Sequence, residues 1–323
     1  MLQYFSYNGA LIIFFPPTDF PPSFWILNRP ILERIDFTVK HLIANNGDIT
    51  KVPNFDYNLL DLYHDVRTNP GGLMKVGGSD QVDDYPIVEP RGKFLLPPSD
   101  LLLPNKKIAL IGHSAGGWIS RAYLSKRKYG GKVYGGQEYV HSLVTLGTPN
   151  ANGLGPAFSG IEWCNREPAT IRTLAVGGTG FKGDEWGALT LGAYGFCCPN
   201  GTDGSSYDGD GLTPIFSSLA IEGAETMTID NCTHFPWSDV FGAQWVAPEL
   251  TKDHKEGRPW YGSQEIVEKW ADWIVQWLCI MDMIIFCPTR AEEASHSMIT
   301  TKQETYLSAN KSTRNPRNRD VFN

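Results

Sequence analysis

The sequence predicts an α/β fold with a mostly parallel β-sheet flanked by helices. Short apolar runs alternate along the chain with stretches in which apolar residues have helical spacing, and this alternation is typical of parallel sheets. One such run leads directly into Gly112-His113-Ser114-Ala115-Gly116, and a helical stretch follows it. The hydrophobic content of 41% and the charged content of 20% are those of a globular protein. At 323 residues, the length fits one large domain or two smaller ones.

The first hundred residues carry weaker structural signals than the rest of the chain. The apolar run Ala10–Phe15 predicts a strand. Residues 29–44 predict a helix, with Pro30 in its first turn and Asn45-Asn46-Gly47 at its end. From Lys51 to Pro104 no strand or helix is indicated, and such a long irregular stretch is uncommon inside a domain. We therefore assign residues 1–105 to an atypical N-terminal portion of the same domain that continues from residue 106.

From residue 106 onward, strand and helix signals follow each other regularly. The segment from Gly180 to Ser206 interrupts them and predicts an irregular, glycine-rich insertion. We assign residues 106–280 to the domain core and residues 281–323, whose end is polar and basic, to a disordered tail. Apolar runs predict strands, and apolar residues at helical spacing predict helices; the strands are 107–111, 139–146, 170–178 and 225–229, and the helices are 117–124 and 263–278.

A strand, the pattern Gly-x-Ser-x-Gly and a helix together form the arrangement of a nucleophile elbow. The sharp turn of an elbow holds its serine in a strained conformation, and here that serine is Ser114. Glycine is expected at Gly112 and Gly116 because larger side chains would collide with the neighbouring strand and helix. Ser114 is therefore the candidate nucleophile.

A serine nucleophile needs a histidine base, and His234 is the best placed of the seven histidines, because it follows the strand 225–229 directly. His41 and His141 lie within a predicted helix and strand, where a buried histidine with satisfied hydrogen bonds is expected. His113 belongs to the elbow itself, and we expect its side chain to point away from the side of Ser114. The remaining histidines lie in loops or in the tail; they are His64, His254 and His296.

The carboxylate that orients such a base should come from a loop between Ser114 and His234. Asp208-Gly209-Asp210-Gly211-Leu212-Thr213-Pro214 supplies two candidates. Asp210 is preferred because glycines flank it and a hydrophobic residue and proline follow, and Asp208 is the alternative. A plain glycine-rich turn, in which the aspartates only accept backbone N–H groups, stays open as a third interpretation. The order Ser114, Asp210, His234 is that of α/β-hydrolases.

Four motifs give the chain a resemblance to a known superfamily: Ile-Gly-His-Ser-Ala-Gly-Gly-Trp, Thr-Leu-Gly-Thr-Pro-Asn, Gly-Asp-Gly-Leu-Thr-Pro and Arg-Pro-Trp-Tyr-Gly-Ser. Over residues 106–278 the chain resembles lipases and esterases of the α/β-hydrolase superfamily. Within it, the chain is most similar to lipase-like proteins related to GPI inositol-deacylases. The resemblance implies an α/β-hydrolase fold, a carboxylic ester or acyl lipid substrate and no cofactor. It also implies Ser114 as nucleophile, Asp210 as acid, His234 as base and the Ala115 amide as an oxyanion donor.

The chain departs from the superfamily upstream of the elbow. Members carry a Leu-Pro-Gly or His-Gly loop whose backbone amide completes the oxyanion hole, and no such loop is recognisable here. Pro16 and Pro17, after the first apolar run, lack the N–H group that an oxyanion donor needs. A hydrolase-fold binding or scaffold protein with weak or no turnover is therefore the second hypothesis.

Composition bears on partners, metals and location. A net charge of −7 and a pI near 5.5 argue against nucleic acid as a partner. The six cysteines lack the spacing of metal ligands, so no metal site is predicted and buried free thiols are expected. The N-terminal apolar run is too short for a signal peptide or membrane span, which favours an intracellular protein. A lipid substrate would bring it into peripheral contact with a membrane, and the oligomeric state stays open.

Overall fold

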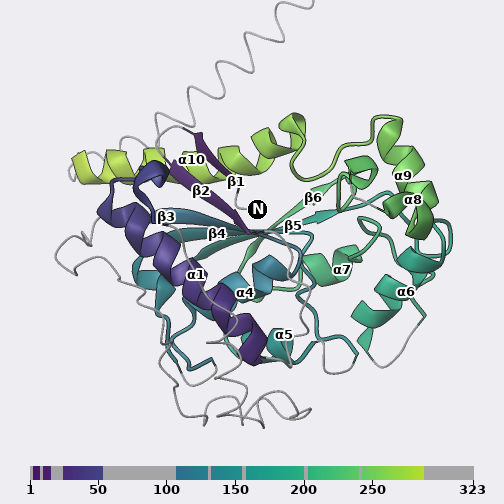
Figure 1. The fold of residues 1–323 in the computed structure, drawn as a ribbon, viewed down its shortest axis with the longest axis horizontal. Coiled ribbons are helices and arrows are strands. Elements are labelled where there is room, and N and C mark those ends of the chain that lie inside the picture. The colour runs from purple at the N-terminus through teal and green to yellow at the C-terminus, as the bar shows by residue number, and fades with distance from the viewer. Residues whose placement is uncertain are drawn as a thin grey trace, which may run out of the picture. The chain divides into compact units, whose positions relative to one another are not determined.

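A six-stranded sheet organises the described part of the chain (Figure 1). In the computed structural model its strands lie side by side in sequence order: β1 (Gln3–Tyr7), β2 (Ala10–Phe15), β3 (Ile108–His113), β4 (Val140–Leu146), β5 (Arg172–Gly178) and β6 (Glu225–Ile229). Strands β2 to β6 are parallel, and β1 pairs with β2 in the antiparallel direction. The α/β class and the mostly parallel sheet expected from the sequence are therefore confirmed.

The structure describes residues 3–7, 10–15, 25–53, 107–129, 132–154, 158–199, 203–239 and 242–286. Met1–Ile274 form one unit of the chain and Val275–Asn323 a second. The α-helices are α1 (Trp25–Ala44), α4 (Ala115–Leu124), α5 (Ser159–Cys164), α6 (Ala188–Cys197), α7 (Ile215–Ser218), α8 (Ala243–Val246), α9 (Pro248–Lys255) and α10 (Gln264–Phe286). Short 3₁₀ helices are η1 (Ile49–Lys51), η4 (Gly136–Glu138) and η7 (Trp237–Asp239). No helix in the described ranges is long and apolar enough to cross a membrane.

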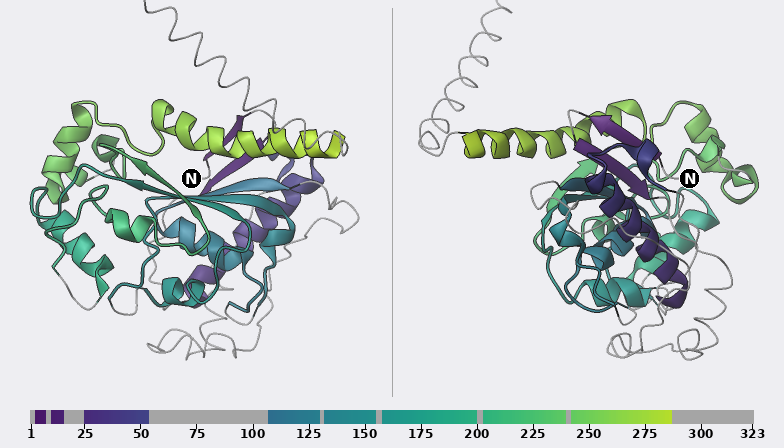
Figure 2. Two further views of the ribbon diagram at one scale, coloured as in Figure 1. Left: turned by 180° about the vertical axis from the view of Figure 1, so that it is seen from behind. Right: turned by 60° about the vertical axis from the view of Figure 1, so that its left-hand side comes forward.

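One face of the sheet packs against α1 and α4, which lie on the same side in both views (Figures 1 and 2). Strand β3 is buried along its whole length, as expected for a parallel strand covered on both faces. The apolar stripes of the two helices interdigitate with the strands beneath them. The resulting core includes Leu32, Ile35, Val39 and Leu42 of α1, Trp118, Ile119, Ala122 and Tyr123 of α4, and Ile108, Leu110, Val140 and Leu143 of β3 and β4.

The first turns of α10 pack against the edge of the sheet formed by β5 and β6. The guanidinium group of Arg172 on β5 stacks on the Trp273 ring, 3.6 Å from its centroid, and donates a hydrogen bond to the Trp273 carbonyl. The indole N–H of Trp273 donates to Glu225 on β6 at 2.9 Å. Trp270, one turn earlier, donates its indole N–H to the carbonyl of Tyr261. These contacts fix the segment before α10, which carries the Arg-Pro-Trp-Tyr-Gly-Ser motif, next to the sheet.

Strand signals in the sequence were more reliable than helix boundaries. The strands expected at 10–15, 107–111, 139–146, 170–178 and 225–229 are confirmed as β2 to β6. The antiparallel strand β1 was missed, although Asn8-Gly9 between the paired residues Tyr7 and Ala10 is a hairpin signal. Helix α1 begins at Trp25, before the expected start at residue 29.

Two expectations about irregular segments need correction. The segment 180–206 contains helix α6, whose Gly192 and Gly195 concealed it because glycine lowers helix propensity. Helix α10 continues to Phe286, inside the range 281–323 that we assigned to a disordered tail, since apolar residues there extend the helical pattern. The rest of that tail and residues 54–106 lie outside the described residues.

Candidate active site

Ser114 forms the turn between β3 and α4 with a backbone conformation that is rare for a residue with a side chain. Its φ is 53° and its ψ is −133°, and such conformations cost about 1–3 kcal/mol. The N–H of Ser114 donates to the carbonyl of Leu146 at the end of β4, and its carbonyl accepts from the N–H of Gly117. The strain expected from the elbow pattern is thus present, and hydrogen bonds on both sides hold it.

Close backbone approach explains the glycines around Ser114. A Cβ on Gly112 would lie 2.5 Å from the Cα of Gly117 and 2.7 Å from the carbonyl carbon of Gly116. A Cβ on Gly117 would overlap the side chain of Thr148. The need for glycine at Gly112 follows from this contact, while Gly116 takes part through its backbone. Gly117, which our sequence analysis did not single out, is the position where strand, helix and the β4 loop meet.

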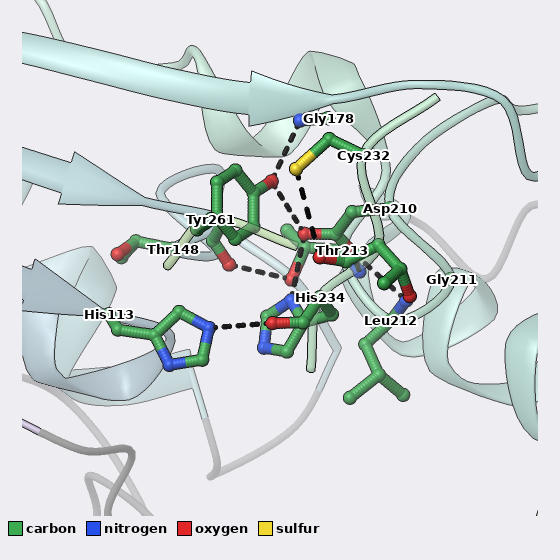
Figure 3. Close-up of polar contacts among 12 residues, drawn as sticks. His113, Thr148, Gly178, Asp210, Gly211, Leu212, Thr213, Cys232, His234 and Tyr261 are labelled. Carbon is green, nitrogen blue, oxygen red and sulfur yellow. Dashed lines mark hydrogen bonds and ion pairs between the residues drawn. The ribbon is translucent and has the colours of Figure 1, made fainter. Parts of the chain in front are cut away.

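His234 is held in the segment after β6 by three hydrogen bonds (Figure 3). Its N–H donates to the carbonyl of Asp210 at 2.8 Å, and its Nδ1 donates to Oδ2 of Asp210 at 2.7 Å. Its carbonyl accepts from Nε2 of His113 at 3.0 Å. The side chain is 1% exposed, and its Nε2 has no hydrogen-bond partner among the described residues. The imidazole is therefore fixed with one nitrogen engaged and the other available.

Asp210 is fully buried, with four hydrogen-bond donors around its carboxylate (Figure 3). Oδ1 accepts from the N–H groups of Leu212 and Thr213 at 3.0 and 2.7 Å. Oδ2 accepts from His234 and from the hydroxyl of Tyr261, the latter at 2.8 Å. A buried carboxylate is stable only when its oxygens are satisfied in this way. The glycine-rich turn therefore presents Asp210 to His234 rather than only capping its own backbone.

Asp208 has a different role in the same loop. Its Oδ1 accepts from the N–H groups of Gly180, Phe181 and Gly209, each at 2.8 Å. These bonds fasten the start of the loop to the segment that follows β5, and none of them reaches His234. The structure joins His234 to Asp210, the preferred of the two candidates, and leaves Asp208 as a loop-holding residue.

The loop after β4 connects Ser114 with the Asp210–His234 pair. Gly147, next to the Leu146 that binds Ser114, has a φ of 56°. A Cβ at this position would lie 2.5 Å from Oδ2 of Asp210 and 3.0 Å from Nδ1 of His234. The carbonyl of Gly147 also accepts from the Thr213 hydroxyl at 2.9 Å. Ser114, His234 and Asp210 thus lie at one edge of the sheet, although the described structure forms no hydrogen bond from Ser114 to Nε2 of His234.

His113 has a role that the sequence analysis missed. Its ring is buried, and the centroids of the His113 and His234 rings are 4.8 Å apart. Nε2 of His113 donates a hydrogen bond to the His234 carbonyl (Figure 3). Burial lowers the pKa of His113 well below its ordinary value, and nearby His234 lowers it further. His113 is therefore a neutral imidazole with its proton on Nε2. We expected its side chain to point away from the side of Ser114; the structure places it against the His234 ring, where it supports the backbone of His234.

The other histidines do not join this cluster. His41 is buried in α1 against the Phe37 ring. His141 on β4 is half-buried, and its Nδ1 has no hydrogen-bond partner among the described residues, whereas we expected a core histidine with satisfied hydrogen bonds. Burial lowers its pKa to about 4. His254 accepts a hydrogen bond from the hydroxyl of Ser238. His64 and His296 lie outside the described residues.

The oxyanion donors are described in part. Ala115 is the first residue of α4, and the first N–H groups of a helix have no acceptor within it. Strand β2 pairs with β3 so that Phe15 lies opposite Gly112, which brings the end of β2 to the elbow. The loop after it, including Pro16, Pro17 and Thr18, lies outside the described residues.

The buried cysteines of the described ranges form neither a disulfide nor a metal site. Four cysteines are free and buried, namely Cys164, Cys197, Cys198 and Cys232. No group of histidine, cysteine or acidic side chains in the described part of the chain is arranged to hold a metal ion. No protein-family model matches the sequence, and neither does any curated protein.

The crowding at the elbow leads to a stability test. We expect Gly112→Ala to lower the free energy of unfolding by about 3 kcal/mol or more, because the new methyl group meets backbone that cannot move aside. Gly192→Ala in α6 is the matched control, since its Cβ would meet nothing within 4 Å and alanine favours a helix by about 1 kcal/mol. Urea denaturation measures both. Equal effects of the two changes would contradict the packing described here.

Proposed function

We propose that this protein is a serine hydrolase of the α/β-hydrolase fold that cleaves carboxylic esters. The observation that carries the proposal is the buried Asp210–His234 hydrogen bond of 2.7 Å at the sheet edge where Ser114 forms a strained turn. Parallel sheets place their reactive groups at the carboxyl ends of the strands. The chain order and the strand–turn–helix context of Ser114 support the same assignment.

The tautomer of His234 suits it to act as a base. Its Nδ1 carries the proton that faces the Asp210 carboxylate, so Nε2 keeps a free lone pair. That Nε2 is buried and has no partner among the described residues. In the proposed reaction Nε2 takes the hydroxyl proton of Ser114 while Oγ forms a bond to the ester carbonyl carbon.

The carbonyl π electrons move to oxygen in this step, and the Ala115 N–H at the start of α4 would donate to the resulting oxyanion. Collapse of the tetrahedral intermediate expels the alcohol, which takes the proton from Nε2 of His234. Nε2 of His234 then takes a proton from water, whose oxygen attacks the carbonyl carbon of the acyl-enzyme. The second tetrahedral intermediate collapses to the free acid as Nε2 returns the proton to Oγ of Ser114. Asp210 keeps the imidazole oriented and stabilises its charged form throughout.

An apolar surface beside the acid loop supports acyl lipids as the substrate class. Helix α6 contains no charged residue, and its exposed side carries Leu191 and Phe196, the latter 64% exposed. The opposite side holds the loop, because the Tyr194 hydroxyl accepts from the N–H of Gly211. The carbonyl of Phe196 accepts from Leu154, another exposed apolar residue. In this proposal the acyl chain of the substrate lies against Leu154, Leu191 and Phe196, and the protein contacts membranes peripherally.

The nucleophile is tested with a fluorophosphonate probe, which reports an activated serine whatever the natural substrate. We expect the wild-type chain to be labelled at Ser114, and Ser114→Ala to lose labelling and esterase activity while keeping its circular dichroism spectrum. Mass spectrometry of the labelled peptide identifies the residue.

Three other results of this experiment would change the proposal. Equal labelling of wild type and Ser114→Ala would remove Ser114 as nucleophile. A folded wild-type chain without labelling would favour the scaffold hypothesis, which the missing bond from Ser114 to His234 Nε2 supports. Labelling with poor ester turnover would point to a missing second oxyanion donor, a loss that typically costs about 10²–10³ in turnover.

The two aspartates of the acid loop should differ sharply in their effect. We expect Asp210→Asn to lower kcat by about 10⁴, because the amide would favour the wrong imidazole tautomer. Asp208→Asn should cost less than about tenfold, because an amide oxygen still accepts the three backbone N–H groups that bind Oδ1. Steady-state kinetics on one ester compares them, and the reverse ranking would move the acid to Asp208.

The substrate class is tested with esters of different chain length. Phe196→Ser should lower kcat/KM for a long-chain ester about tenfold, because an apolar side chain of this size contributes about 1.5–3 kcal/mol when it is buried by a ligand. Activity on an acetate ester should stay within twofold. Val133→Ser, at another exposed apolar residue, is the control. An equal loss on both esters would exclude Phe196 as an acyl contact.

A further inference from the structure

The segment Arg258–Ser263 is tied to the residues around His234 along most of its length. The carbonyl of Pro259 accepts from the N–H of Thr233 at 2.9 Å, and Trp260 forms a parallel bridge with Thr233. Arg258 pairs with Asp253 and donates to Asn231 at 2.9 Å. This segment therefore runs directly beside the chain that carries the base, and the reaction proposed above gives it no role.

Tyr261 is the residue of this segment that reaches the acid (Figure 3). Its side chain is fully buried, and its hydroxyl lies between two groups. It accepts from the N–H of Gly178 at the end of β5 at 2.7 Å. It donates its one proton to Oδ2 of Asp210 at 2.8 Å. The hydroxyl thus links the sheet directly to the carboxylate oxygen that also binds His234.

We propose that Tyr261 is a positioning residue that holds Oδ2 of Asp210 in line with Nδ1 of His234. This inference rests on the proposed function for its catalytic consequence, since Tyr261 acts only through the acid and the base. Its structural content, a hydrogen bond that sets how strongly Asp210 attracts the imidazole proton, stands by itself and can be measured in the folded protein without substrate.

The shared oxygen explains why this bond matters. Oδ1 of Asp210 is held by two backbone N–H groups, whereas Oδ2 is held by two side chains, Tyr261 and His234. Removing the Tyr261 hydroxyl leaves His234 as the side-chain donor on Oδ2 and concentrates negative charge there. The protonated imidazole is then stabilised more strongly, so His234 would hold its second proton up to a higher pH.

Four titratable groups in and around this network are held in their uncharged forms. Burial raises the pKa of Tyr261 well above its ordinary value, and the nearby Asp210 raises it further, so the Tyr261 hydroxyl keeps its proton and remains a donor. The same two causes raise the pKa of Tyr194 from α6 and of Cys232 ahead of His234. Burial lowers the pKa of His113 from β3. All four are uncharged at neutral pH, so a shift in titration reports the Tyr261 bond.

Tyr194 of α6 provides a matched control, because its hydroxyl binds the same acid loop. It is also fully buried, accepts from the N–H of Gly211 and donates to the carbonyl of Phe181 at 2.8 Å. Its hydroxyl therefore makes the same kinds of hydrogen bond as Tyr261, except that the proton goes to a neutral carbonyl. Tyr194→Phe and Tyr261→Phe each remove one hydroxyl group from a fully buried ring. The Tyr261 hydroxyl binds Asp210 itself, whereas the Tyr194 hydroxyl binds the neighbouring residue, Gly211.

The experiment compares the two variants in the full-length chain. NMR follows the His234 imidazole through a pH titration, and kinetics on one ester gives kcat, KM and the acidic limb of the rate profile. We expect Tyr261→Phe to move the His234 titration midpoint and the acidic limb to higher pH. It should lower kcat about tenfold, the loss expected for a hydrogen bond to a charged group, with KM within twofold. Tyr194→Phe should change neither midpoint nor limb.

A third variant keeps the inference testable if Tyr261→Phe does not fold. Tyr261→3-fluorotyrosine retains the ring and both hydrogen bonds but is a stronger donor, so it should move the His234 midpoint to lower pH. Equal shifts from Tyr261→Phe and Tyr194→Phe, or no shift in any variant at position 261, would overturn the positioning role even in an active hydrolase. A shift specific to position 261 in a chain that neither labels nor turns over would support the role and refute the proposed function.

Discussion

The buried carboxylate of Asp210 is the constraint on which the site depends. A carboxylate out of contact with water is tolerated only when hydrogen bonds compensate for its lost hydration. Four donors from three segments do so here, and the most distant of them, Tyr261, is itself fixed to the end of β5. Because each donor is directional, satisfying the carboxylate also fixes the loop that carries it, the segment after β6 and the segment before α10.

The parallel sheet supplies the rigidity that this arrangement requires. Neighbouring strands β3 to β6 end at one edge, so the segments that leave them meet there without long excursions. The strain at Ser114 is held by a bond to Leu146 of the next strand. Gly147 follows that strand, and a Cβ at this position would lie 2.5 Å from Oδ2 of Asp210. The end of β4 therefore lies between the elbow and the acid–base pair. The backbone is crowded on both sides of it, so glycine is needed at Gly117 and Gly147.

Local patterns reveal much of this arrangement, and long-range contacts account for what they do not reveal. The strands from β2 onward and the pairing of His234 with Asp210 follow from apolar runs, glycines and chain order, which are visible within a few residues. The support that His113 gives to His234 joins residues far apart in the sequence. So does the lack of room for a Cβ at Gly117, which the Thr148 side chain causes. Helix α6 escaped notice because two glycines and an apolar exposed side hide its periodicity.

In the described structure, the hydrogen bond from Ser114 to Nε2 of His234 is not formed. Forming it would require only a small movement of one side chain. Turning the His234 ring would break the bond from Nδ1 to Asp210, and moving its backbone would break two more, made by its N–H and its carbonyl. Its buried Nε2 has no partner among the residues that the structure describes, and an unsatisfied buried polar atom costs about 1–3 kcal/mol. A rotation about χ1 of Ser114 moves only a hydroxyl group among staggered positions. A hydrogen bond from Ser114 would satisfy Nε2 and remove this free-energy cost. Because the acid–base pair is rigid, we expect the serine side chain to move rather than the histidine.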